Sequence, residues 1–79
     1  MARRPEELAF YTALRKRADA YGAPGCEAIE ECAAELAVPL KRATRWLEKW
    51  ELKGWWECGV SLRTGWFTKK APIAIPAEG

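Results

Sequence analysis

The chain has 79 residues, enough for one domain with one hydrophobic core. Apolar residues make up 49%, too large a share for an intrinsically disordered protein, and the net charge of +2 does not by itself demand a nucleic-acid partner. The sequence has neither a run of about 18 apolar residues that could span a membrane nor the apolar stretch of a secretion signal after Met1, so we expect a cytoplasmic protein.

The first two predicted elements are amphipathic helices. Residues 5–21 begin with a proline and two glutamates, which suit a first helical turn, and a glycine follows them. Three- and four-residue steps give this helix an apolar stripe of Leu8, Tyr11, Leu14, Ala18 and Tyr21. Residues 26–36 form a shorter helix, which has an acidic face and needs tertiary packing to persist. Its apolar face carries Ile29, Cys32, Ala33 and Leu36.

A third helix is predicted over residues 39–53, because Pro39 is acceptable at its first position and Gly54 ends it. At about 100° per residue, one face is apolar and turns toward the core. This face carries Ala43, Trp46, Leu47 and Trp50. The opposite side gathers four cations, Lys41, Arg42, Arg45 and Lys49, within an arc of about 100°.

Residues 55–60 and 65–70 are aromatic, partly alternating runs joined by a short turn, a pattern typical of a β-hairpin. An isolated hairpin is marginally stable, so we expect it to pack on the helices, with Trp66 as the tryptophan most exposed to solvent. The predicted fold class is therefore α+β, mainly α. It comprises one domain over residues 1–70 and an apolar, proline-bounded tail over residues 71–79.

This order of three helices, a tight link between the second and third, and a hairpin resembles the winged helix-turn-helix superfamily of small prokaryotic or viral DNA-binding regulators. The resemblance is clearest over residues 29–56, where an apolar pair precedes a turn ending in Val38. The chain departs from the family at Ala37, where glycine is usual, so a left-handed Ala37 would carry strain of roughly 1 kcal/mol. It also departs at Trp46, which replaces a small residue and must pack against the first helix, the tail or a second subunit.

The resemblance implies that the third helix enters the major groove of double-stranded DNA and that the hairpin lies as a wing on the DNA backbone. The residues expected to contact DNA are Leu40, Lys41, Arg42, Thr44, Arg45 and Lys49 of the helix, and Arg63, Lys69 and Lys70 of the wing. Because the chain contains no asparagine or glutamine, it cannot make the bidentate adenine contact, and we predict a preference for guanine. A second basic cluster within residues 3–17 has no predicted position relative to the groove.

Other interpretations of the same residues stay open. The basic arc is also typical of a solvated helix face with Glu48 and Glu51 as ion-pair partners, and Lys69 and Lys70 also suit an edge strand protected against aggregation. The alternative function is a protein-binding winged-helix module, such as a viral factor docking on host polymerase or replication machinery. Modest net charge, the acidic second helix and the apolar tail favour that alternative.

We expect no enzyme, because the chain has no histidine, no glycine-rich phosphate loop and no motif that pairs a nucleophile with a base. The three cysteines have no recognisable zinc spacing, so no metal, cofactor or small-molecule ligand is predicted, and Cys32 is expected to be a small core residue. One domain of this size covers little DNA, so useful affinity calls for a homodimer, a protein partner or neighbouring sites. The missing amide side chains also fit a thermophilic source or a GC-rich genome.

Overall fold

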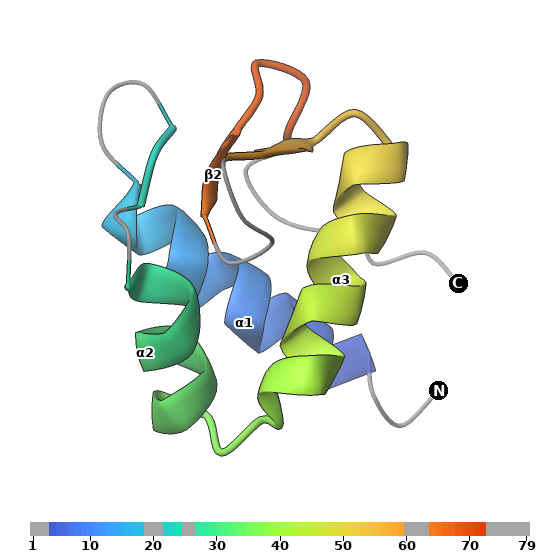
Figure 1. Ribbon diagram of the computed structural model, residues 1–79. Coiled ribbons are helices and arrows are strands. Elements are labelled where there is room, and N and C mark those ends of the chain that lie inside the picture. The colour runs from blue at the N-terminus through green and yellow to red at the C-terminus, as the bar shows by residue number, and fades with distance from the viewer. Residues whose placement is uncertain (1–3, 19–21, 25–26, 60–63, 73–79) are drawn as a thin grey trace.

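Three helices and a two-stranded antiparallel hairpin follow one another along the chain (Figure 1). The helices are α1 (Arg4–Arg17), α2 (Ala28–Glu35) and α3 (Leu40–Leu52), and the strands are β1 (Trp56–Cys58) and β2 (Gly65–Phe67). The predicted α+β, mainly α fold class is confirmed, with the hairpin placed after a three-helix core.

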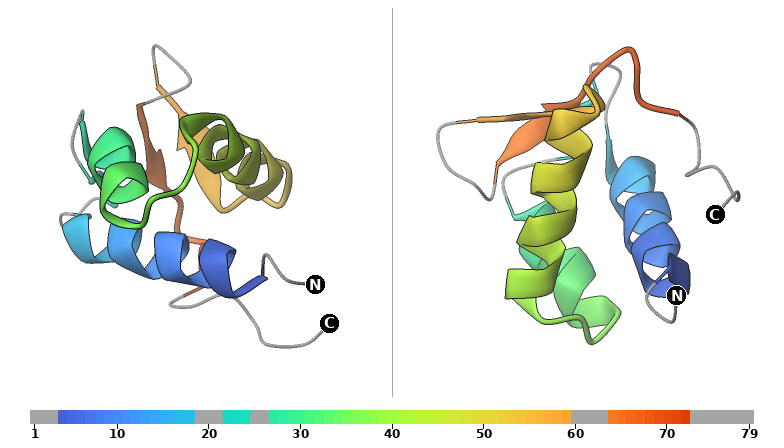
Figure 2. Two further views of the ribbon diagram at one scale, coloured as in Figure 1. Left: turned by 90° about the horizontal axis from the view of Figure 1, so that it is seen from below. Right: turned by 90° about the vertical axis from the view of Figure 1, so that its right-hand side faces the viewer.

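The computed structural model describes residues 4–18, 22–24, 27–59 and 64–72. Within these ranges no helix combines the length and the apolar character that spanning a bilayer requires. Figure 2 shows α1 lying across one side of the pair formed by α2 and α3, while the hairpin lies at the C-terminal end of α3. The short link between α2 and α3 therefore lies at the opposite end of α3 from the hairpin (Figure 1).

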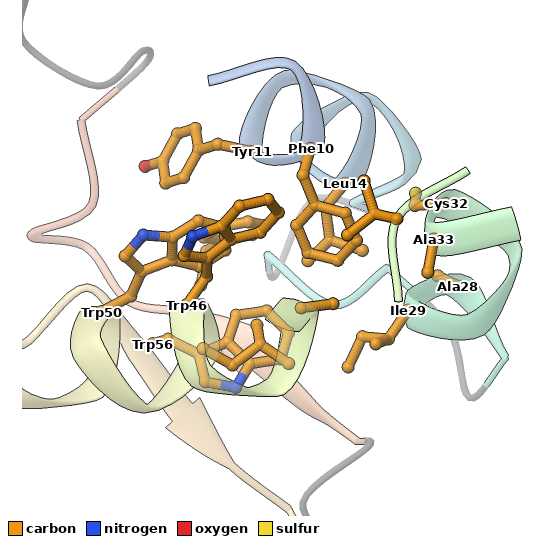
Figure 3. Packing of buried hydrophobic residues seen from close by; sticks show 14 residues of the cluster. Phe10, Tyr11, Leu14, Ala28, Ile29, Cys32, Ala33, Trp46, Trp50 and Trp56 are labelled. Carbon is orange, nitrogen blue, oxygen red and sulfur yellow. The ribbon is translucent and has the colours of Figure 1, made fainter. Parts of the chain in front are cut away.

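The core is built around aromatic rings from α1, α3 and the hairpin (Figure 3). The Tyr11 ring forms T-shaped contacts with the rings of Trp50 and Phe67 at centroid distances of 4.9 and 5.2 Å. Each such pair contributes about 0.5–1.5 kcal/mol beyond simple burial of area. Trp46 is buried, and its ring lies 5.6 Å from the Phe10 ring, so the first helix, one of the three surfaces expected to cover Trp46, packs against it.

The hairpin presents one face to this core and one to solvent. Trp56 pairs with Phe67, and both are buried, whereas the next pair, Glu57 and Trp66, points outward. Trp66 is 40% exposed, as expected, and the other four tryptophans are buried or half-buried. Gly65 has a φ of 154°, and a Cβ at this position would come within 2.8 Å of the Trp56 ring, so the close packing of the two strands requires glycine here.

The first helix ends at Arg17, so the prediction that it continues through Ala18 is wrong; residues 19–21 lie outside the described part of the chain. The physical reason is a contact with the hairpin. Gly22, at a φ of 84°, accepts a hydrogen bond from the Phe67 N–H at 2.7 Å, and a Cβ on Gly22 would approach the Phe67 carbonyl to 2.5 Å. The chain must leave the helix to make this contact.

The apolar stripe predicted for the first helix is also rotated from the true core face. Leu8 is 41% exposed, whereas Phe10 is fully buried. The inward face of α1 carries Glu7, Phe10, Tyr11 and Leu14. Because Glu7 is a carboxylate, the spacing of apolar residues alone does not identify this face. At the end of the second helix Leu36 is likewise more exposed than predicted, at 36%.

Ala37 has a φ of 56°, so the strained left-handed conformation that the resemblance raised for this turn is present between α2 and α3. Because Ala37 is exposed, Ala37→Gly should relieve the backbone strain without loss of packing and raise the free energy of unfolding by about 0.5–1 kcal/mol. Ala34→Gly, at an exposed position inside α2, is the matched control and should lower it by about 1 kcal/mol. Urea denaturation of the two variants measures both effects, and a loss of stability in both would contradict the assignment of strain to Ala37.

Candidate nucleic-acid interface

The third helix is held in place by its apolar side. Pro39 is the residue before the first turn, and its carbonyl accepts hydrogen bonds from the N–H groups of Arg42 and Ala43. The helix therefore begins at Leu40, one residue later than predicted. The buried residues of α3 are Ala43, Trp46, Leu47 and Trp50, the four predicted to face the core. Burial of this face leaves the opposite side of the helix in solvent.

Lys41 and Arg45 occupy that outer side, one helical turn apart, and both are exposed. Neither takes part in an ion pair with any residue in the described ranges. Leu52 lies seven residues after Arg45 on the same side and is 90% exposed. The outer side of α3 thus presents two cations near its N-terminal end and an exposed leucine at its C-terminal end.

Arg42 and Lys49 differ from these two cations, because both are paired with carboxylates of α1. Arg42 Nη1 lies 2.7 Å from Glu6 Oε1, and Lys49 Nζ lies 2.9 Å from Glu7 Oε1. The interpretation of the basic arc as a solvated face named Glu48 and Glu51 as the partners, and no ion pair involves either of them within the described ranges. Glu51 instead accepts a hydrogen bond from Cys58 Sγ.

Glu7 is a buried carboxylate that the sequence analysis missed. Its side chain is 7% exposed and uses both oxygens: Oε1 binds Lys49 Nζ, and Oε2 accepts a 2.9 Å hydrogen bond from Trp50 Nε1. A buried charge persists when it is paired and hydrogen-bonded, and here both conditions are met. The sequence does contain one signal of this burial. Glu7 lies three and four residues before Phe10 and Tyr11, and therefore on the same helix face as these two residues.

The remaining candidates on α3 are partly engaged in the fold. Leu40 is half-buried against the core, which restricts it as a contact for a thymine methyl group. Thr44 Oγ1 donates a 2.9 Å hydrogen bond to the Lys41 carbonyl and is half-buried. An open depression lies on this part of α3. It is lined by Pro39, Lys41, Arg42, Arg45, Trp46 and Lys49.

In the predicted wing, Lys69 and Lys70 are exposed and follow β2. Both line a second open depression with Gly54 and Glu57, which places them beside the end of α3. Arg63, the candidate at the hairpin tip, lies outside the described residues. The structure therefore brings the two wing lysines near the C-terminal end of the same helix that carries Lys41 and Arg45.

Two cations of the second basic cluster, Arg15 and Arg17, contact other parts of the fold. The Arg15 guanidinium lies over the Phe67 ring at 5.1 Å. Arg17 pairs with Glu35 at 2.9 Å and with Glu31 at 3.7 Å. These cations at the end of α1 therefore bind the hairpin and the acidic face of α2, and not the outer side of α3.

The two described cysteines, Cys32 and Cys58, are free thiols that contact other side chains of the fold. Cys32 is buried, and burial raises its pKa, although the Arg17 guanidinium 3.3 Å from the sulfur opposes the shift. Burial and the hydrogen bond to Glu51 raise the pKa of Cys58. Because both pKa values are raised, both thiols are protonated near neutral pH. Separately, the described residues contain no group of three or more side chains suited to hold a metal ion.

The first two residues of the predicted tail are attached to the fold. Ala71 is half-buried against the core, and the Tyr11 hydroxyl donates a 2.5 Å hydrogen bond to the Pro72 carbonyl. Burial raises the pKa of Tyr11, so this hydroxyl remains a donor throughout the neutral range. Residues 73–79 lie outside the described part of the chain.

Comparisons of the chain with protein-family models, with curated proteins and with solved structures gave no match. Three features distinguish α3 and its surroundings. They are an exposed helix side with two unpaired cations among the described residues, a flank where α1 neutralises two more, and two lysines at the base of the hairpin.

Proposed function

We propose that the protein is a small DNA-binding regulator of the winged helix-turn-helix type, which inserts the outer side of α3 into the major groove. The observation that carries the proposal is the pair Lys41 and Arg45, exposed one turn apart on a helix whose opposite side is fixed in the core. A helix fits the major groove of B-DNA, and lysine and arginine side chains are the usual partners of guanine O6 and N7. The hairpin would then lie beside the DNA backbone, with Lys69 and Lys70 available for phosphate.

The arrangement of charges supports this function over a merely solvated helix face. Two of the four cations of the basic arc have carboxylate partners from α1, yet the two on the outermost line of the helix do not within the described ranges. On α2, Glu31 and Glu35 are paired with Arg17 at the end of α1, which reduces the repulsion that these two carboxylates would exert on DNA bound on α3. Burial of Trp46 and Trp50 in the core directs the opposite side of α3 to solvent.

The proposed regulator acts in the cytoplasm by binding DNA, without a catalytic step or a cofactor. A domain of this size covers little DNA, so tight binding calls for a dimer or for neighbouring sites. Trp46 is buried against Phe10 and is therefore not a candidate for the surface of such a dimer.

A protein-binding module is the second candidate function, and one observation favours it. Leu52 is 90% exposed on the same side of α3 as Arg45, where an apolar side chain would suit a protein partner. The ion pairs that neutralise Arg42 and Lys49 also leave less positive charge for DNA. The salt dependence of binding separates the two functions, because a hydrophobic interface releases few counterions.

The test is fluorescence anisotropy of the protein with a random-sequence duplex between about 50 and 200 mM salt. With Lys41, Arg45, Lys69 and Lys70 available, we expect the logarithm of the binding constant to fall against the logarithm of salt concentration with a slope of about −2 to −4. Selection from a random DNA library is expected to fix guanine at contacted positions. No binding to duplex, or selected sites fixed only by adenine, would contradict the proposal.

A further inference from the structure

The ion pair between Glu6 and Arg42 joins the start of α1 to the flank of the proposed DNA-binding helix. Arg42 Nη1 and Glu6 Oε1 lie 2.7 Å apart, and both side chains are in contact with solvent, at 28% and 46% exposure. Among the described residues, Arg42 is the one polar partner of the Glu6 carboxylate. Glu6 can therefore leave this contact for water without breaking any other hydrogen bond of the described side chains.

The neighbouring pair of Glu7 and Lys49 has no such freedom. Glu7 is 7% exposed, and its second oxygen is bound to Trp50 Nε1 in the core. Withdrawal of Lys49 would leave a buried carboxylate without its cation, which is costly. Of the two paired cations of α3, only Arg42 is thus held by a partner that can be exchanged.

Arg42 also lies where an exchange with DNA would occur. It lines the same open depression as Lys41 and Arg45. A phosphate held near these two cations would therefore be close to the Arg42 guanidinium. Guanidinium binds phosphate and carboxylate through the same charge-assisted, fork-shaped geometry, so the two anions are chemical competitors for it.

We propose that Glu6 competes with DNA phosphate for Arg42 and so lowers the affinity of α3 for nucleic acid. The carboxylate occupies the guanidinium in the free protein and must be displaced before Arg42 can neutralise a phosphate. This inference depends on the proposed DNA-binding function and adds a residue of α1 that sets its strength.

Glu6→Gln tests the competition, because glutamine keeps the size of the side chain and removes the charge that holds Arg42. Exposed ion pairs are worth up to about 1 kcal/mol, so we expect the variant to bind a random duplex about 2- to 5-fold more tightly. One more cation then becomes available to phosphate, and the salt slope should steepen by about 0.9. Glu27→Gln, at the exposed residue before α2 and without an ion pair to Arg42, makes the same change in net charge and serves as the control.

The double variant Glu6→Gln with Arg42→Ala assigns the effect to this contact, and its gain over Arg42→Ala alone should be no larger than that of the Glu27→Gln control. Equal affinities for Glu6→Gln and Glu27→Gln, or a full gain in the absence of Arg42, would overturn the competition while leaving DNA binding intact. Failure of the unaltered protein to bind DNA would overturn both the competition and the proposed function. Urea denaturation of each variant verifies that the chains compared are folded.

Discussion

Replacing Glu7 with alanine is expected to lower the free energy of unfolding by about 2–3 kcal/mol. The change leaves the buried Trp50 Nε1 group without its acceptor, removes the partner of Lys49 and opens a gap between α1 and α3. For a domain of this length the loss corresponds to a fall in Tm of roughly 10–20 °C. Thermal and urea denaturation, followed by circular dichroism, measure it.

Two variants show whether burial of the Glu7 carboxylate is the cause. Glu6→Ala removes the adjacent glutamate, whose ion pair is exposed, and should cost less than about 1 kcal/mol. Glu7→Gln keeps an acceptor for Trp50 Nε1 but loses the charge that pairs with Lys49, so its cost should lie between the other two. If Glu6→Ala and Glu7→Ala destabilised the protein equally, Glu7 would not be the buried link between the helices.

The elements whose signals are local were predictable from the sequence. The core side of α3 follows directly from the spacing of Ala43, Leu47 and Trp50, and all three are buried. Trp66 was also correctly expected to be the most exposed tryptophan, and the resemblance pointed to Ala37 as the position where a left-handed residue would be strained.

Features that depend on contacts between distant segments were not predictable in the same way. Glu6 and Arg42 are 36 residues apart, and nothing in either segment alone indicates that they meet. The end of α1 is likewise decided by Gly22, whose carbonyl binds the Phe67 N–H in the hairpin. All four cations of the basic arc were therefore predicted to face DNA, whereas packing of α1 leaves two of them exposed and pairs the other two with carboxylates.

The largest effect on binding is expected from the double variant Lys41→Ala with Arg45→Ala. Each side chain offers a direct contact with a base or a phosphate, so each replacement should weaken DNA binding about tenfold and the pair about 100-fold. The salt slope should become shallower by about 2, because two fewer counterions are released. Both residues are exposed and lie outside the core, so the stability of the fold should change by less than about 0.5 kcal/mol. Anisotropy with the duplex used for the unaltered protein gives both the affinity and the slope.

The most direct measurement compares Lys41→Ala with Lys16→Ala on that duplex at one salt concentration. Both lysines are exposed, neither has an ion pair within the described ranges, and the two variants lose the same charge. They differ in place, because Lys41 lies on the outer side of α3 and Lys16 near the end of α1. If the outer side of α3 is the DNA-binding surface, Lys41→Ala weakens binding about tenfold and Lys16→Ala less than about twofold. Equal losses for the two variants would mean that DNA responds only to net charge, and would contradict the assignment of α3 as the binding helix.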